Sequence, residues 1–174
     1  AIMPPDSAEA LARKRGAEVA VEATNAEVGA ARRAGALVVT TQDWHPADTP
    51  HFAKDGGTWP VHCVAGTPGA DYHPAIDESL IDVHVRKGQG KPAYSIFEGT
   101  TDEGETVTAL LDRLDVTEID VVGIATDYCV LASALDAREA GRGVRVLTDL
   151  VAGVAPETTA TALETMAAAD VTLA

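Results

Sequence analysis

Short β-rich runs alternate with helical segments along most of this chain, and the alternation limits the folds that it can adopt. Valine and isoleucine dominate the runs, and polar residues or glycines bound them, as is typical of buried strands. Each run is shorter than an ordinary helix. The pattern predicts strands at residues 36–41, 81–86, 119–123, 144–148 and 171–173.

Between these runs, apolar residues recur at helical spacing. The spacing predicts helices at residues 17–34, 105–114, 129–140 and 156–168. Gly35 follows the first helix and Pro156 opens the last one, which are the usual positions for these residue types. Strands that alternate with helices pair in parallel and carry the helices on both faces of the sheet. The sequence therefore predicts an α/β fold with three layers, α/β/α, around a mainly parallel central sheet.

The length of 174 residues suits one domain, which we expect to span residues 1–174. Pro4 and Pro5 favour irregular structure over residues 1–9. A net charge of −14 argues against nucleic acid or an anionic membrane as a partner. No apolar run approaches the roughly 20 residues of a membrane span, and no secretory leader is visible. The two cysteines form no spaced framework, which favours a reducing cytoplasm. The sequence leaves open whether the protein forms a homo-oligomer.

Two long loops, at residues 42–78 and 88–104, follow the ends of predicted strands. The first loop holds four of the five histidines of the chain. Long loops in compact domains are usually functional, and open parallel sheets bind ligands beyond the carboxyl ends of their strands. We therefore expect the polar residues of both loops at one rim of the sheet.

The first of these loops contains a candidate metal site. One carboxylate and three imidazoles lie within 20 positions of one another: Asp43, His45, His51 and His62. This ligand set suits zinc, iron or manganese. Solvated loop histidines are the alternative, which four clustered candidates disfavour. Cys63 directly follows His62 and points the other way in an extended segment, so we expect it to be structural.

Cys129 lies between the third predicted strand and the helix that follows it, at the end of the segment GIATDYC. A thiol at a helix N-terminus meets the positive end of the helix dipole and free backbone N–H groups. These favour the thiolate and can also hold an oxyanion. The position thus makes Cys129 a candidate nucleophile, and a buried, inert cysteine is the alternative that it leaves open.

A nucleophilic thiol needs a charged partner, and Lys87 directly follows the second predicted strand. That position puts its ammonium at the same rim as Cys129, although a solvated surface lysine is the commoner case. Tyr94 and Phe97 in the next loop either form an aromatic wall for a flat substrate or pack the loop down.

Together these segments resemble the isochorismatase-like cysteine hydrolases, and within them the metal-containing nicotinamidase/pyrazinamidase enzymes. The similarity covers roughly residues 10–174. Its most specific parts are WPVHCVAGTPGADYHP and GIATDYC. The matching segments are TQDWHPADTPHF (41–52), TWPVHCVAGTPGADYHP (58–74), VRKGQGKPAYSIFEG (85–99), VVGIATDYCVLASALDA (121–137) and TDLVAGV (148–154).

The resemblance implies a Rossmann-like, isochorismatase-like fold and an amidohydrolase that converts nicotinamide, or flat carboxamides such as pyrazinamide, to the acid and ammonia. Cys129 would attack the carboxamide and form a thioester, and Lys87 would stabilise the thiolate. The backbone N–H groups of Ala125 and Cys129 would form the oxyanion hole, with a cis peptide between Ile124 and Ala125.

The resemblance also implies one divalent metal ion that receives the ring nitrogen, and a ring pocket lined by Trp59 and Tyr94. The implied metal ligands are Asp43, His45, His51 and His62. Two alternatives stay open. One is a catalytically silent metal- or ligand-binding member of the fold, and the other is a cysteine amidase for a different small amide.

The sequence departs from the family at its start. Members of the family begin with a hydrophobic strand that ends in a catalytic aspartate, and the given residues contain no such strand. We expect that aspartate upstream of Ala1. Asp6 is the only acid near this position, but no strand precedes it to place it.

Overall fold

The computed structural model describes residues 8–174, with side chains from residue 21 onward. The helices are α1 (Ala8–Arg33), α2 (Val107–Arg113), α3 (Leu131–Glu139) and α4 (Pro156–Ala168). The strands are β1 (Val39–Asp43), β2 (Val83–Lys87), β3 (Thr100–Thr101), β4 (Glu118–Ile124), β5 (Gly143–Ala152) and β6 (Thr172–Leu173). Within these residues no helix has the length and apolarity of a membrane span.

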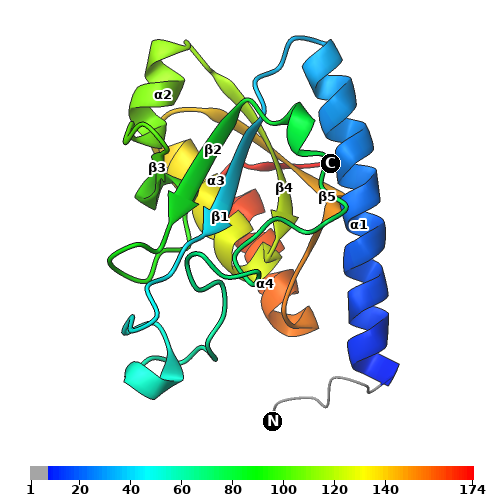
Figure 1. The fold of residues 1–174 in the computed structure, drawn as a ribbon. Coiled ribbons are helices and arrows are strands. Elements are labelled where there is room, and N and C mark those ends of the chain that lie inside the picture. Colours follow the sequence, from blue (N-terminus) through cyan, green and yellow to red (C-terminus); the bar gives the residue numbers. More distant parts are fainter. Residues whose placement is uncertain (1–7) are drawn as a thin grey trace.

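The strands form a mainly parallel arrangement, shown in Figure 1. β1 pairs with β2 in parallel, and β3 runs antiparallel on the other side of β2. β5 lies between β4 and β6 and is parallel to both. The α/β class predicted from the alternation is therefore confirmed, with the strands divided into two three-stranded sheets, β1-β2-β3 and β4-β5-β6.

β1 and β4 are edge strands of these two sheets. Over residues 8–174 each pairs with a single neighbour, β2 for β1 and β5 for β4. The expectation about the first strand of the family stays a prediction. Asp6, the acid considered as a substitute for the family aspartate, lies outside the described residues.

Helices cover both faces of the β4-β5-β6 sheet (Figure 1). Alternate residues of a strand point to opposite faces. Val144 and Val146 of β5 are buried in a cluster with residues of α3 and α4. Leu147 and Asp149 of the same strand line a cavity with Ala23 of α1. α1 therefore lies on one face and α3 and α4 on the other, which gives the three predicted layers.

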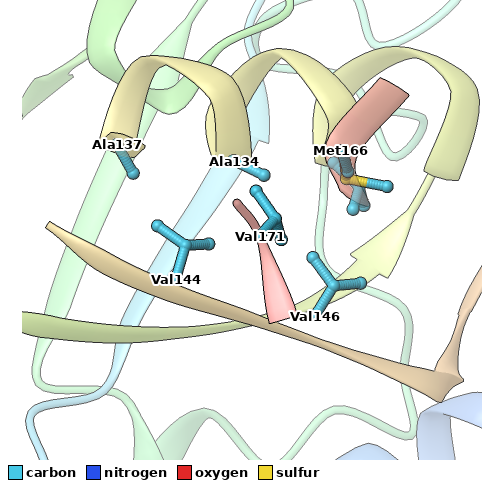
Figure 2. Packing of buried hydrophobic residues seen from close by; sticks show 7 residues of the cluster. Ala134, Ala137, Val144, Val146, Met166 and Val171 are labelled. Carbon is cyan, nitrogen blue, oxygen red and sulfur yellow. The ribbon is translucent and has the colours of Figure 1, made fainter. Parts of the chain in front are cut away.

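The main core lies between β5 and the pair α3 and α4. Figure 2 shows its buried members, which are Val130, Ala134, Ala137, Val144, Val146, Met166 and Val171. Small alanines of α3 let the helix approach the valines of β5 closely, and Met166 fills the space at the end of the cluster. A second core, built from Val85, Val107 and Leu111, joins β2 to α2. Phe97 packs against both cores.

Several boundaries differ from the sequence-based expectations. β5 extends to Ala152, beyond the expected residues 144–148, and the short strand β3 lies in the loop expected at residues 88–104. α1 begins at Ala8, so the irregular structure expected over residues 1–9 is wrong for residues 8 and 9. Strong helix formers extend the helix toward the N-terminus. β1 is shifted from 36–41 to end at Asp43, because its ladder with β2 extends until Asp43 faces Lys87. The helix expected from residue 129 is preceded by a separate π-helical turn, Thr126–Val130.

Candidate active site

The candidate site lies where three strand ends meet. Asp43 is the last residue of β1, Lys87 is the last residue of β2, and their Cα positions are paired across the ladder. The π-helical turn that carries Cys129 follows β4 directly. Because β1, β2 and β4 end at the same rim, side chains from both sheets come together there. The rim predicted from the loops is therefore the place where these residues meet.

Cys129 is a free, half-buried thiol in the turn that leads into α3. The Nζ atom of Lys87 lies 3.4 Å from its Sγ atom. A cis peptide joins Ile124 to Ala125 just before the turn, as the resemblance implies. The sequence alone did not exclude that Cys129 is an inert packing residue. Its contact with a buried ammonium distinguishes it from one.

Lys87 is almost completely buried, with 2% of its side chain exposed. Its ammonium donates to the Oδ1 atom of Asp43, to the carbonyl of Ala93 at 3.1 Å and to the thiol of Cys129. Burial by itself lowers the pKa of Lys87, but Cys129 and Asp43 outweigh burial and raise it above its ordinary value. Lys87 is therefore a fixed positive charge beside the sulfur.

Three imidazoles gather next to this pair. The ligand atoms of His45, His51 and His62 all lie within 4.8 Å of one another. His45 and His51 are buried, and burial lowers the pKa of both below its ordinary value. Neutral imidazole is the form that coordinates a metal.

One nitrogen of this cluster lacks a partner. Among the described residues nothing hydrogen-bonds to the buried Nε2 atom of His45, whereas its Nδ1 atom faces the carbonyl of Gly88 at 3.2 Å. The Nδ1 atom of His62 likewise faces the carbonyl of Pro60, at 2.7 Å. Such second contacts orient a ring so that the other nitrogen can bind a metal. The donor set therefore fits a divalent metal ion.

Asp43 lies between the imidazoles and the nucleophile. Its Oδ1 atom contacts the ammonium of Lys87 and is 3.9 Å from the Nε2 atom of His45. The three-histidine cluster does not include it. In this structure the carboxylate neutralises Lys87, so its predicted role as the fourth ligand remains a prediction.

Aromatic side chains connect the imidazoles to the nucleophile turn. The Nε1 atom of Trp59 donates to the Tyr94 hydroxyl at 2.9 Å, and Trp59 stacks on His51 with centroids 6.0 Å apart. Tyr128, adjacent to Cys129, contacts Trp59 and Tyr94 with centroids 4.9 and 5.4 Å away. Trp59 and Tyr94 thus lie together, and their role in lining a ring pocket stays a prediction, whereas Phe97 belongs to the core.

Sequence reasoning missed three residues around the site. Tyr128 could have been found as the direct neighbour of Cys129. Phe52 is fully buried and has its ring 5.7 Å from that of His45, although its position after His51 gave no sign of this. A Cβ atom at Gly88 would lie 2.4 Å from the His45 ring, so this position needs glycine.

Cys63 lies beside the imidazoles but outside their cluster. Its carbonyl accepts a hydrogen bond from the backbone N–H of His45 at 3.0 Å. Burial raises the pKa of its thiol, which disfavours the thiolate. These contacts agree with the expectation that Cys63 has a structural role.

A parallel α/β sheet with a thiol, an ammonium and three imidazoles at its carboxyl rim defines a hydrolase with a cysteine nucleophile and a site fit for a metal. Comparison with known families agrees with this class. The profile described as "Isochorismatase domain" matches residues 5–174, so the chain belongs to this family. With nicotinamidases among its relatives, it is an amidohydrolase.

Several characterised relatives are similar over most of the chain. Nicotinamidase/pyrazinamidase of Mycobacterium tuberculosis is 48% identical over 139 residues, which cover 78% of this chain and 75% of the relative. Nicotinamidase of Escherichia coli is 33% identical, over 88% of this chain and 81% of the relative. The crystal structure of pyrazinamidase of Pyrococcus horikoshii in complex with zinc has a TM-score of 0.81 and 36% identity. It covers 91% of this chain and 86% of that one.

Proposed function

We propose that this enzyme hydrolyses nicotinamide, and similar flat carboxamides such as pyrazinamide, to the acid and ammonia. The observation that carries the proposal is the 3.4 Å contact between Lys87 Nζ and Cys129 Sγ beside the three-histidine cluster. Relatives named nicotinamidase or pyrazinamidase support the choice of substrate. We also propose that it acts in the cytoplasm, because two cysteines without a spaced framework suit a reducing compartment. Its substrates are proposed to be small molecules, since a net charge of −14 repels nucleic acid and anionic lipid.

The reaction begins at Cys129. Lys87 holds the sulfur as a thiolate, which attacks the carboxamide carbon and forms a C–S bond. The tetrahedral intermediate collapses, the C–N bond breaks, and the nitrogen leaves as ammonia with the proton that the thiol gave up. Water then adds to the thioester, releases the acid and returns a proton to the sulfur.

The charge that develops on the carbonyl oxygen needs donors. The backbone N–H groups of Ala125 and Cys129 are the proposed donors, at the start and within the π-helical turn. Preorganised donors of this kind contribute about 3 kcal/mol each to transition-state stabilisation.

The proposed metal ligands are His45, His51 and His62, with Asp43 as the fourth. The buried Nε2 atom of His45 that lacks a partner supports the assignment, as does the zinc complex of a similar pyrazinamidase. A bound divalent ion, whether zinc, iron or manganese, would supply a Lewis-acidic position for the ring nitrogen of the substrate. Trp59, Tyr94 and Tyr128 would provide the flat apolar surface against which the ring packs.

The proposal is tested by replacing each of the two cysteines and measuring ammonia release from nicotinamide. Cys129→Ala should lose turnover while it keeps the bound metal of the wild type, because Cys129 lies outside the ligand cluster. Cys63→Ser is the matched control and should keep turnover. Retained turnover in Cys129→Ala would exclude the cysteine mechanism, and metal without turnover in the wild type would indicate a catalytically silent member of the family.

A further inference from the structure

The turn that carries the nucleophile is anchored to a helix outside the site. Asp127 lies two residues before Cys129, and its carboxylate bonds to the segment that leads from β5 into α4. Oδ1 accepts from the backbone N–H of Val154 at 3.0 Å. Oδ2 accepts from the N–H of Ala155 at 3.4 Å and from the hydroxyl of Thr158. None of these bonds involves the thiol, the ammonium or the imidazoles.

The charge of Asp127 suits this place. The N-cap residue of α4 is Ala155, which has no side chain that could cap the helix. A carboxylate near the first turn of a helix interacts favourably with the helix dipole. Partial burial raises the pKa of Asp127, but its hydrogen bonds to Thr158, Val154 and Ala155 outweigh burial and lower the pKa below its ordinary value. Asp127 is therefore ionised at neutral pH.

The nucleophile turn itself is short. It spans Thr126–Val130, and the N–H groups of Tyr128 and Val130 both bond to the carbonyl of Ala125 at 3.1 Å. Those bonds define the shape of the turn but not its orientation relative to the sheet that carries Lys87. Orientation needs a contact to a separate, rigid element, and the bonds of Asp127 to the start of α4 provide one.

We propose that Asp127 is a positioning residue that fixes the nucleophile turn on the N-terminus of α4 and so directs Cys129 toward Lys87. It acts through the backbone of the turn and does not touch the substrate. The inference deepens the proposed function and relies on it wherever turnover is the readout. A displacement of about 1 Å at a reacting atom costs about a hundredfold in rate.

The test uses four variants in a Cys63→Ser background, so that Cys129 is the single thiol. Asp127→Ala and Asp127→Asn change the carboxylate, and Thr158→Val removes one of its donors while the charge stays. Thr161→Val is the matched control. Thr161 is an exposed threonine of the same helix whose hydroxyl bonds to the carbonyl of Glu157, within α4. The measurements are the rate of iodoacetamide alkylation of Cys129 across pH, kcat and KM for nicotinamide, and metal content.

We expect Asp127→Ala to slow alkylation at neutral pH several-fold and to lower kcat about tenfold to a hundredfold, with KM within about twofold and metal content unchanged. Asp127→Asn and Thr158→Val should show smaller changes in the same direction, and Thr161→Val should match the parent. If Asp127→Ala does not fold, Asp127→Asn and Thr158→Val decide the question.

Two results would overturn the inference. One is wild-type alkylation and kcat in all the Asp127 and Thr158 variants. The other is faster alkylation in Asp127→Asn with no change in Thr158→Val, which would mean that Asp127 acts by its charge alone. Alkylation does not need turnover, so a parent enzyme that released no ammonia would refute the proposed function while this test remained decisive.

Discussion

Lys87 is a buried ammonium whose neighbours are a carboxylate and a thiol. A lysine that follows a strand is usually solvated, so the sequence could place Lys87 at the rim but could not predict its burial. The raised pKa of Lys87 determines how its contribution to stability depends on pH. The contribution of the ammonium is complete below the ordinary pKa of 10.5 and is lost as the pH rises through the higher value of the folded protein.

Lys87→Met should test the role of this charge. Methionine keeps much of the side-chain volume and removes the ammonium beside Cys129. We expect kcat for nicotinamide to fall about a hundredfold or more, because the thiolate loses its counter-charge. Lys91→Met is the control, since Lys91 lies in the loop that follows Lys87 and is 73% exposed. Equal kcat values in the two variants would contradict the proposed role of Lys87.

Asp127 leads to a prediction about acid stability. Its pKa is lower in the folded protein than its ordinary value of 3.8, so its contribution to stability is present above 3.8 and is lost as the pH falls through the folded value. The Tm of the wild type should therefore exceed that of Asp127→Asn by a constant amount above about pH 5. The gap should narrow as the pH falls below 3.8 in thermal melts. A gap that does not depend on pH would show that the ionised carboxylate does not stabilise the fold.

At the scale of elements, the loop after β2 holds His45 in place. Gly88 has a φ of +78°, which a side chain rarely adopts, and a Cβ atom there would clash with the His45 ring. Gly66 has a similar φ of +74° but open space around it. Substitutions at the two glycines therefore distinguish the cost of backbone strain from the cost of a clash with the His45 ring.

Gly66→Ala should cost about 1 kcal/mol of stability, from the unfavourable φ alone. Gly88→Ala should cost more and should also weaken metal binding about tenfold or more, because the His45 ring must move. Metal titration of both variants checks this expectation. Equal metal affinity in the two variants would show that His45 is not a ligand, or that its ring has room to move.

The sequence predicted most elements but not how they end. The apolar pattern was sufficient for β4 and α4, whose expected ranges lie within one residue of the observed ones, because both patterns are well bounded. β1 was misplaced because Gln42 and Asp43 are poor strand formers whose pairing depends on β2. The π-helical turn before α3 was missed because a helical pattern of apolar residues has the same spacing whether or not its first turn is widened.

At the scale of the whole molecule, the site is shared between the two sheets. Asp43 and Lys87 come from the ends of β1 and β2, whereas Cys129 follows β4 of the other sheet. The residues at these strand ends could be predicted, because parallel strands end at one rim. The contact of Asp43 with Lys87, the place of Tyr128 and the anchor made by Asp127 could not be predicted, because they depend on loop paths and side-chain rotamers.

The core that supports the sheet of Cys129 should dominate stability. Met166 of α4 is fully buried and packs with residues of α3 and β5. Met166→Ala should lower the free energy of unfolding by about 2–5 kcal/mol, because it leaves a cavity that the alanines of α3 do not fill. Leu114→Ala, at a position 42% exposed, should change it by less than about 0.5 kcal/mol. Denaturant unfolding measures both, and equal losses would argue against the core described here.

The central claim is that one chain combines a metal site with a thiol that cleaves a carboxamide. The most direct measurement is the release of ammonia and nicotinate from nicotinamide by the purified protein, with bound metal determined on the same sample. The account predicts equal amounts of the two products, and a rate that rises in proportion to metal content. Bound metal with no release of ammonia would contradict it.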